Sequence, residues 1–392
     1  MQPVICSIAR TPIGRFNGGL APVSAMDLGG VAITGALERA GLAGSDVEEV
    51  LFGHVLQAGQ GQITARQAAV RAGVPMTVPA VTINKVCLSG LTAIQEAANH
   101  VRLGESTFVV AGGMESMTNA PYVLPGAREG YRMGNKEVVD VMTHDGLFCA
   151  FDSCMMGESS DRKNDDLGIG RTEQDAWSAS SHARAAKATE DGTFAREIVS
   201  VPVPQRRGEP INVDSDEGIR TATTQESLGS LRPAFHPGGT ITAGNASQIS
   251  DGAAAVVVAD RAAAEAAGLP IIAEIVGYGQ TAGPDATLHE RPAEALRIAL
   301  KRSSLDVGDL DLVEFNEAFA SVALWSARML GIDDARVNVH GGAVALGHPL
   351  GATGARIVVT LLNALAARGG EFGAAALCGG GGQVDAMIVR MV

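Results

Sequence analysis

Two cysteines and one histidine in this sequence stand beside backbone that suits acyl transfer through a thioester. Cys87 lies in the segment Asn84–Gly90, Cys378 is followed by four glycines, and His348 stands between a glycine and a proline. One thiol can carry an acyl group, the other can move a proton, and free backbone N–H groups can hold an oxyanion. These residue types predict covalent acyl chemistry.

Cys87 is expected at a turn between a strand and a helix. Val78–Ile83 is rich in β-branched residues, and Ser89–Leu103 carries an apolar stripe at helical spacing. At a helix N-terminus the thiolate is favoured by the dipole and by unpaired N–H groups. The alternative is a small buried residue, because free cysteines are often buried.

His348 is expected in a rigid loop before a helix at Gly351–Arg368. Pro349 biases His348 away from helical dihedral angles. A lone histidine can be structural, but here it could take the proton of Cys87. Cys378 ends a predicted strand and could move the proton on the carbon next to a thioester, or could simply close that strand. Asn316 follows a strand at Leu312–Phe315 and could serve an oxyanion or cap a helix.

The elements that must position these residues form two similar α/β halves. A strand, a glycine-flanked loop, an alanine-rich helix and a buried strand occur at Val78–Gly113 and again at Val337–Gly380. This predicts a duplication of domain size, and the interface of two such halves is a usual place for a small-molecule site. Further strands are predicted at Pro3–Ile8, Val47–Gly53, Thr107–Ala111, Gly252–Ala259, Ile271–Gly277, Val337–Val339, Gly373–Leu377 and Val384–Met391, and further helices at Ser24–Ala40, Thr64–Ala72, Thr172–Thr189 and Pro292–Arg302.

Between Thr118 and Asn245 the chain is more polar and reads as an inserted, irregular cap rather than a further sheet. Its arginines could form a solvated face or contact a nucleotide phosphate. They are Arg206, Arg207, Arg220 and Arg232. Ser247 could bond a pantetheine amide or cap a turn.

Composition limits the other classes of function. With 392 residues, 46% hydrophobic residues and 49 glycines, the chain predicts two or three globular domains. No run reaches about 18 apolar residues, so no membrane span is expected. Neither a signal peptide nor a peroxisomal or lipidation signal is expected at the ends. The five scattered cysteines indicate a reducing, cytoplasmic setting, no metal site is expected, and a net charge of −13 argues against nucleic acid.

Six segments together resemble the thiolase family, in the family's order along the whole chain. They are Asn84–Gly90, Gly112–Met117, Gly244–Ser247, Asn316–Ala320, Gly341–Gly354 and Cys378–Gly382. The resemblance implies an α/β fold with a five-layered αβαβα core from two duplicated halves and an inserted, α-rich cap. It places one half at residues 1–118 with 250–271, the cap at 119–249 and the other half at 272–392, and it implies a homodimer or homotetramer.

The same resemblance implies a role for each site residue. Cys87 is similar to the acylated nucleophile and His348 to its activating base. Cys378 is similar to the acid/base for the α-carbon or the leaving thiol, and Asn316 to the holder of an oxyanion-site water. The N–H groups of Cys87 and Gly380 are similar to a second oxyanion hole.

Coenzyme A is implied as substrate and product, with no other cofactor. Its expected contacts are Ser247, Arg220, Ser227, Met156, Phe319 and Ala243. Two segments depart from the family pattern, Met155-Met156-Gly157, where a histidine is usual at the first position, and Leu288–Pro292. Because both are expected near the acyl pocket, they bear on the preferred acyl chain.

The reaction implied is the reversible condensation of two acetyl-CoA to acetoacetyl-CoA, which is acetyl-CoA C-acetyltransferase activity. One alternative is a degradative 3-ketoacyl-CoA thiolase with longer chains. A decarboxylating ketosynthase typically uses a second histidine where this chain has Cys378. A non-catalytic acyl-CoA-binding relative would need no second thiol, so both of these are disfavoured.

Overall fold

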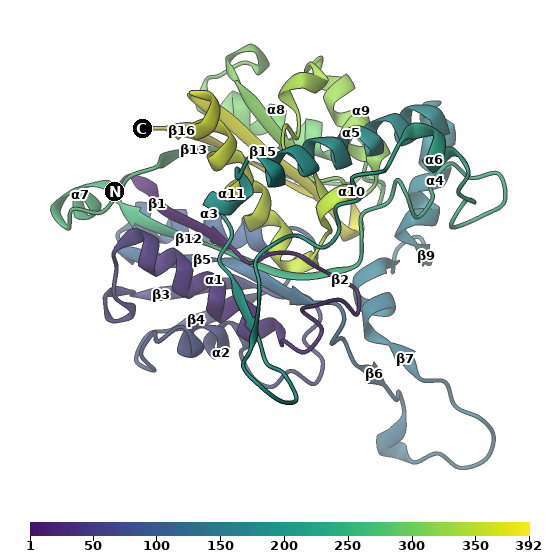
Figure 1. The fold of residues 1–392 in the computed structure, drawn as a ribbon, viewed down its shortest axis with the longest axis horizontal. Helices are drawn as coiled ribbons and strands as arrows, with labels where there is room; N and C mark the ends of the chain where they lie inside the picture. The colour runs from purple at the N-terminus through teal and green to yellow at the C-terminus, as the bar shows by residue number, and fades with distance from the viewer.

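The computed structural model describes residues 1–392 and is built on one ten-stranded mixed sheet (Figure 1). Buried, β-branched and alanine-rich segments form its central strands, as continuous apolar runs predict. In spatial order the strands are β14 (Leu312–Phe315), β15 (Phe372–Gly379), β16 (Gln383–Met391), β13 (Ala273–Ala282), β1 (Pro3–Arg10), β12 (Ser250–Asp260), β5 (Phe108–Ser116), β3 (Glu49–Gly53) and β4 (Ala80–Ile83), with β2 (Gly14–Arg15) beside β12.

The sheet consists of two halves that join along a short seam. Strands β1 and β13 pair only at Val4 with Glu274 and at Ile5 with Ala273. Each half has parallel pairs at its outer side, β4–β3–β5 in one and β14–β15 in the other, and antiparallel pairs toward the seam. The expected duplication is therefore visible in the topology.

Helices cover both outer faces and fill the space between the halves. The largest hydrophobic cluster surrounds α3 (Ser89–Leu103) and α11 (Leu350–Arg368), which lie between the two halves of the sheet. A second cluster lies under α1 (Ala25–Ala40) and α2 (Thr64–Arg71), and a third under α8 (Arg291–Ser303) and α9 (Ala320–Leu330). This order of helix, sheet, helix, sheet and helix is the five-layered αβαβα core that was predicted.

Helix α11 is long and apolar enough to cross a membrane, but 89% of its apolar window is buried inside the protein. It lies in the middle layer, so its apolar character is explained by packing on both sides.

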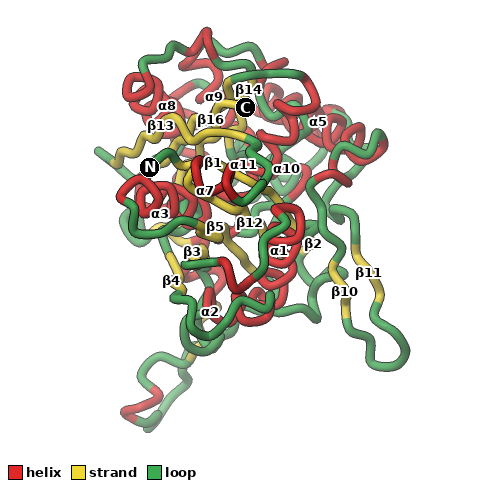
Figure 2. The backbone as a smooth tube through the Cα atoms, turned by 90° about the vertical axis from the view of Figure 1, so that its left-hand side faces the viewer, coloured by secondary structure: helices red, strands yellow, loops and turns green.

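The insertion between β5 and β12 is irregular, as expected, and contains helices and short hairpins. Its elements are β6 (Tyr122–Val123), β7 (Val139–Asp140), β8 (Phe148–Cys149), β9 (Cys154–Met155), α4 (Met156–Leu167), α5 (Arg171–Glu190), β10 (Val201–Val203), β11 (Ile211–Val213) and α6 (Gln225–Gly229). The excursion with β6 and β7 projects from the molecule in Figure 1, and the β10–β11 hairpin stands out in Figure 2. The boundaries predicted at 118/119, 249/250 and 271/272 stay a prediction. Two further short helices, α7 (Arg261–Ala266) and α10 (Ala343–Leu346), lie outside this insertion, after β12 and before α11.

One predicted strand is wrong. Val337–Val339 makes a single parallel bridge, between Val337 and Val313, and no strand. Asn338 has a φ of 46°, which ends the extended conformation after one residue. Its side-chain amide accepts from the Phe315 N–H and donates to the Phe315 carbonyl, so it replaces hydrogen bonds that a neighbouring strand would make.

Candidate active site

The site lies where the first turns of α3 and α11 cross. Their backbones approach so closely that only glycine fits at the contact. A Cβ on Gly354 would lie 2.3 Å from the Leu91 nitrogen, and one on Gly90 would lie 2.8 Å from the Ala355 nitrogen. Each helix is preceded by one of the predicted residues, so this contact brings Cys87 and His348 together.

The Cys87 thiol and the His348 imidazole are within hydrogen-bonding distance, and the direction of the bond is set by Thr353. His348 Nε2 lies 3.3 Å from Cys87 Sγ, and Nδ1 lies 2.7 Å from Thr353 Oγ1. The Thr353 hydroxyl donates to the Pro349 carbonyl at 2.9 Å, so it accepts from Nδ1–H. The tautomer assigned on this basis leaves Nε2 free to accept the proton of Cys87.

Burial keeps both partners neutral in the resting protein. It raises the pKa of the Cys87 thiol to about 12, and the charge of Glu115 adds to the shift. Burial, followed by the charge of Arg356, lowers the pKa of His348 to about 3. Hydrogen bonds from the N–H groups of Cys87 and Gly380 lower the pKa of the Cys87 thiol, but burial raises it by more. The expected stabilisation of the thiolate by backbone N–H groups is therefore present, but desolvation is the larger effect and the resting thiol keeps its proton.

The turn that carries Cys87 is strained and held in place. Val86 has a φ of 51°, which is rare for a β-branched residue and is typical of functional sites. The Ser89 hydroxyl donates to the Val86 carbonyl at 2.6 Å and accepts from the Lys85 N–H at 2.8 Å. The Lys85 ammonium pairs with the buried Asp385 carboxylate at 2.8 Å, which ties the turn to β16 of the other half.

Asn316 is fully buried beside His348, and the structure excludes the helix-cap interpretation. Helix α9 begins at Ala320 after Phe319, four residues beyond Asn316. Asn316 Nδ2 lies 3.4 Å from His348 Nε2, while its Oδ1 has no protein partner. The amide is thus placed to serve a group bound next to the imidazole.

Cys378 is the last residue but one of β15 and is 1% exposed. Burial raises the pKa of its thiol, and the charge of a Cys87 thiolate would raise it further, which places the two sulfur atoms near each other. Gly380 directs its N–H at Cys87, as its effect on that thiol shows. The five predicted catalytic residues, Cys87, His348, Cys378, Asn316 and Gly380, therefore gather at one place.

A cavity of about 530 Å³ adjoins this cluster, because its lining residues Gln248 and Phe319 contact His348 and Cys378. Five of the six residues predicted to contact coenzyme A line it, namely Met156, Arg220, Ala243, Ser247 and Phe319. Its lining is mostly apolar, with the exposed Arg15 and Arg220 as its only charged residues. The carbonyl of Gln248, one of the lining residues, accepts the His348 N–H at 3.0 Å. An apolar channel with cationic groups suits a long neutral chain that ends in phosphates.

The remaining predicted contacts do not line this cavity. Ser227 is exposed, and its hydroxyl bonds only with the backbone of Thr224 at the start of α6. Its contact with coenzyme A stays a prediction. Arg206, Arg207 and Arg232 are also exposed and outside the lining, which favours the solvated-face interpretation for them.

The two segments that depart from the family pattern have different surroundings. Met155 lines the cavity, and Leu288 packs in one cluster with Cys378 and Phe319. The His289 side chain is buried elsewhere, with Nε2 bonded to Asn164 and Ser321. Met155 is thus at the cavity and Leu288 beside Cys378, whereas the His289 side chain bonds within another part of the protein. The bearing of these segments on the acyl chain stays a prediction.

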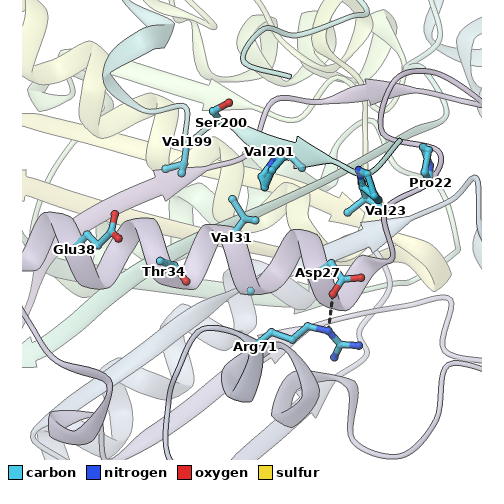
Figure 3. A pocket seen from close by; sticks show the side chains of 13 residues that line it. Pro22, Val23, Asp27, Val31, Thr34, Glu38, Arg71, Val199, Ser200 and Val201 are labelled. Carbon is cyan, nitrogen blue, oxygen red and sulfur yellow. Dashed lines mark hydrogen bonds and ion pairs between the residues drawn. The ribbon is translucent and has the colours of Figure 1, made fainter. Parts of the chain in front are cut away.

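A larger cavity, of about 620 Å³, lies away from the cluster. It is a groove between α1 and the start of the β10–β11 hairpin, where Val31 faces Val201 and Asp27 pairs with Arg71 (Figure 3). None of the predicted catalytic residues lines it. No group of three or more His, Cys, Asp or Glu side chains is placed to hold a metal ion.

Comparisons with known proteins agree with this geometry. Residues 3–262 match the thiolase N-terminal domain and residues 269–391 the thiolase C-terminal domain. The chain belongs to the thiolase family. It is 52% identical over 387 residues to a probable acetyl-CoA acetyltransferase of Mycolicibacterium smegmatis, covering 99% of this chain and 100% of that one. It is 48% identical over 388 residues to the acetyl-CoA acetyltransferase of Escherichia coli, covering 99% and 98%.

The fold is likewise that of a solved thiolase. The crystal structure of the Bacillus anthracis acetyl-CoA acetyltransferase superposes with a TM-score of 0.97 at 39% identity, covering 100% of this chain and 99% of that one. The family and the fold class predicted from the sequence are both confirmed.

Several residues of this thiolase site were missed by the sequence reasoning. Thr353 orients His348, and the buried Glu115 carboxylate accepts from the Gly351 N–H at 3.0 Å at the start of α11. Glu317 accepts from Trp177, Ser181, Asn338 and Val344, which fixes the backbone next to Asn316. All three lie in or beside the recognised motifs, but only the fold reveals their partners. Arg15, at the cavity, has no sequence signal because it lies in the two-residue strand β2, far from the recognised motifs in the sequence.

Proposed function

We propose that this thiolase catalyses the reversible transfer of an acetyl group between two acetyl-CoA molecules, giving acetoacetyl-CoA and coenzyme A. The main observation in support of this reaction is the 3.3 Å contact of Cys87 Sγ with His348 Nε2, beside a second buried thiol at Cys378. The names of the relatives in Mycolicibacterium smegmatis and Escherichia coli support acetyl-CoA as the substrate.

In the acylation half-reaction, Cys87 gives its proton to His348 Nε2 and attacks the thioester carbonyl. The imidazolium that forms donates through Nδ1–H to Thr353, and its Nε2–H lies beside the Asn316 amide nitrogen, so that both groups can donate to a bound oxygen. The bond to the leaving thiolate breaks, and Cys378 gives that thiolate its proton. The products are acetyl-Cys87, coenzyme A, a Cys378 thiolate and a protonated His348.

In the condensation half-reaction, the Cys378 thiolate takes a proton from the methyl carbon of a second acetyl-CoA. The enolate oxygen is stabilised at the His348 and Asn316 position, and the carbon attacks acetyl-Cys87. The N–H groups of Cys87 and Gly380 stabilise the oxyanion that forms there. Collapse expels the Cys87 thiolate, which recovers its proton from His348, so the enzyme returns to its resting state without a further cofactor.

The surroundings of Cys378 support a short acyl chain. Its side chain packs in one buried cluster with Ile241, Leu288, Phe319 and Val322. Apolar side chains therefore surround the place beside Cys378 where the α-carbon of the second acyl-CoA would react. Such an enclosed place fits the methyl group of acetyl-CoA better than a long acyl chain.

Thiolysis of acetoacetyl-CoA, compared with longer 3-ketoacyl-CoA thioesters, tests the proposal through loss of the 3-keto absorbance. We expect rapid cleavage of the four-carbon substrate and slow cleavage of longer ones. Faster cleavage of longer chains would make the chain a degradative thiolase. No cleavage of any substrate by wild-type protein would refute the catalytic assignment.

We also propose a homodimer built on the outer edge of β4. Its residues are only partly buried, unlike those of the central strands, and Val81 is 47% exposed. Exposed Ile63, Val70 and Met76 lie on the adjoining segments. An open apolar edge of this kind favours strand pairing with a second copy. Val81→Lys is expected to shift the protein to monomer in sedimentation measurements, and an unchanged dimer would contradict this interface.

The projecting excursion supports a further step to a homotetramer. Tyr122, Leu124, Met133 and Val138 are exposed on it, and apolar groups so far from the core suit contact with another dimer. A cytoplasmic location is proposed from the chemistry of the cysteines, because all five are free in a chain that needs two of them as thiols.

A further inference from the structure

Two cysteines outside the catalytic cluster face each other across a short hairpin. In β8 and β9, Cys149 pairs directly with Cys154 and Phe148 with Met155, and residues 150–153 form the connecting loop. Directly opposed residues of antiparallel strands have Cα atoms about 4.5–5.5 Å apart. A disulfide needs about 4.4–6.8 Å, so the backbone is already placed for one.

The two thiols are close together and near solvent. Both are free, with 6% and 8% exposure for Cys149 and Cys154, while all four loop residues between them are exposed. Burial, followed by the charge of Glu158, raises the pKa of Cys154, and Cys149 is among the smaller contributors, in keeping with the pairing of the two residues across the hairpin. The Asp152 N–H donates to Cys149 Sγ at 3.4 Å, a contact that stabilises sulfur as it gains negative charge.

The hairpin connects the substrate cavity to the catalytic backbone. Leu147, directly before β8, lines the cavity, as do Met155 and Met156. At the hairpin tip, the Phe151 ring lies over Gly381, where an added Cβ would be 2.7 Å from the ring. Gly381 follows Gly380, whose N–H is directed at Cys87. Movement of this hairpin would therefore alter both the cavity wall and the loop beside the nucleophile.

We propose that Cys149 and Cys154 are a reversible oxidation site whose disulfide locks the hairpin over the cavity and slows acyl transfer. A peroxide is the oxidant. Hydrogen peroxide converts one thiol to a sulfenic acid and releases water, and the second thiol then displaces the hydroxyl as a second water and forms the S–S bond. A dithiol reductant returns both thiols by exchange. The effect on turnover rests on the proposed function, whereas the disulfide itself does not.

The disulfide is tested first by mass spectrometry, independently of activity. Phe151 lies between the two cysteines, so chymotryptic cleavage after Phe151 separates them. After peroxide treatment and alkylation of remaining thiols, we expect the two fragments to stay linked until a reductant is added. Separate, alkylated fragments from peroxide-treated protein would overturn the proposal, whatever the protein catalyses.

The effect on turnover is tested with acetoacetyl-CoA thiolysis before and after oxidation, each rate divided by that of the reduced form. The control is the double variant Cys149→Ser/Cys154→Ser, which keeps Cys87 and Cys378. We expect the kcat/KM of the wild type to fall at least roughly threefold, because a restrained active-site loop slows the steps in which it must move. Dithiothreitol should restore the original kcat/KM. The double variant should lose none by this route. Equal loss in both proteins, or a linked hairpin with an unchanged rate, would refute the regulatory role.

Discussion

Replacing Thr353 with valine should slow acylation of Cys87 while leaving the fold intact. The change keeps the volume of the side chain but removes the oxygen that accepts from His348 Nδ1–H at 2.7 Å. That bond strengthens when His348 takes the proton of Cys87 and becomes charged. A hydrogen bond to a charged group contributes about 1.5–3 kcal/mol. At about 1.4 kcal/mol for each factor of ten, the acylation rate should fall roughly 10- to 150-fold.

The assay is the rate of coenzyme A release from acetyl-CoA in a single turnover, with thiolysis kcat and KM measured alongside. Thr353→Ser keeps the hydroxyl and should retain most of the rate. Thr360→Val is the matched control, because it removes a comparable buried bond, to Glu197 at 3.1 Å, on the same helix. An acylation rate of Thr353→Val within twofold of the wild type, or equal losses in the Thr353 and Thr360 variants, would refute the positioning argument.

Three further outcomes are expected. Cys378→Ala should slow condensation far more than acylation of Cys87, measured as acetoacetyl-CoA formation against acetyl-enzyme formation, and equal slowing would contradict its role. With pKa values of about 12 for Cys87 and about 3 for His348, the neutral pair persists at all pH values between them, so alkylation of Cys87 by iodoacetamide should show no inflection near neutral pH. An inflection there would indicate a resting thiolate–imidazolium pair. Lys85→Met should lower the free energy of unfolding by about 2 kcal/mol, less than the roughly 3–5 kcal/mol of a fully buried pair because Lys85 is partly exposed. Adding Asp385→Asn should recover much of that loss in thermal unfolding, and no recovery would contradict the pairing.

Much of the fold could be predicted because local patterns and packing agree. Helix α3 shows an apolar stripe at helical spacing and a glycine stop at Gly104, and the structure ends it there in a left-handed cap. The strand predicted at Val337–Val339 failed because Asn338, which no local pattern marks, adopts a positive φ. Its conformation is set by bonds to Phe315 and Glu317, far away in the sequence.

In the candidate site, too, some features could be predicted from local sequence and others depend on tertiary packing. Cys87, His348 and Cys378 could be proposed from residue type and flanking glycine, and the fold places them together. The pKa of Cys87 could not be predicted, because the helix terminus lowers it and burial raises it, and only the packed structure shows that burial is larger. Thr353 lies within the recognised motif, only five residues after His348, but its role depends on the side-chain geometry at the start of α11. Arg15 reaches the cavity only through the tertiary fold.

The most direct test of the central claim is to locate the acetyl group on the enzyme. The protein is incubated with acetyl-CoA alone, quenched in acid and digested. The tryptic peptide Val86–Arg102 contains Cys87 as its only cysteine, and Gly369–Arg390 contains only Cys378, so tandem mass spectrometry separates the two. We expect acetylation of Cys87 in the wild type and in Cys378→Ala, and none in Cys87→Ala. Acetylation of Cys378 in place of Cys87, or turnover by Cys87→Ala, would contradict it.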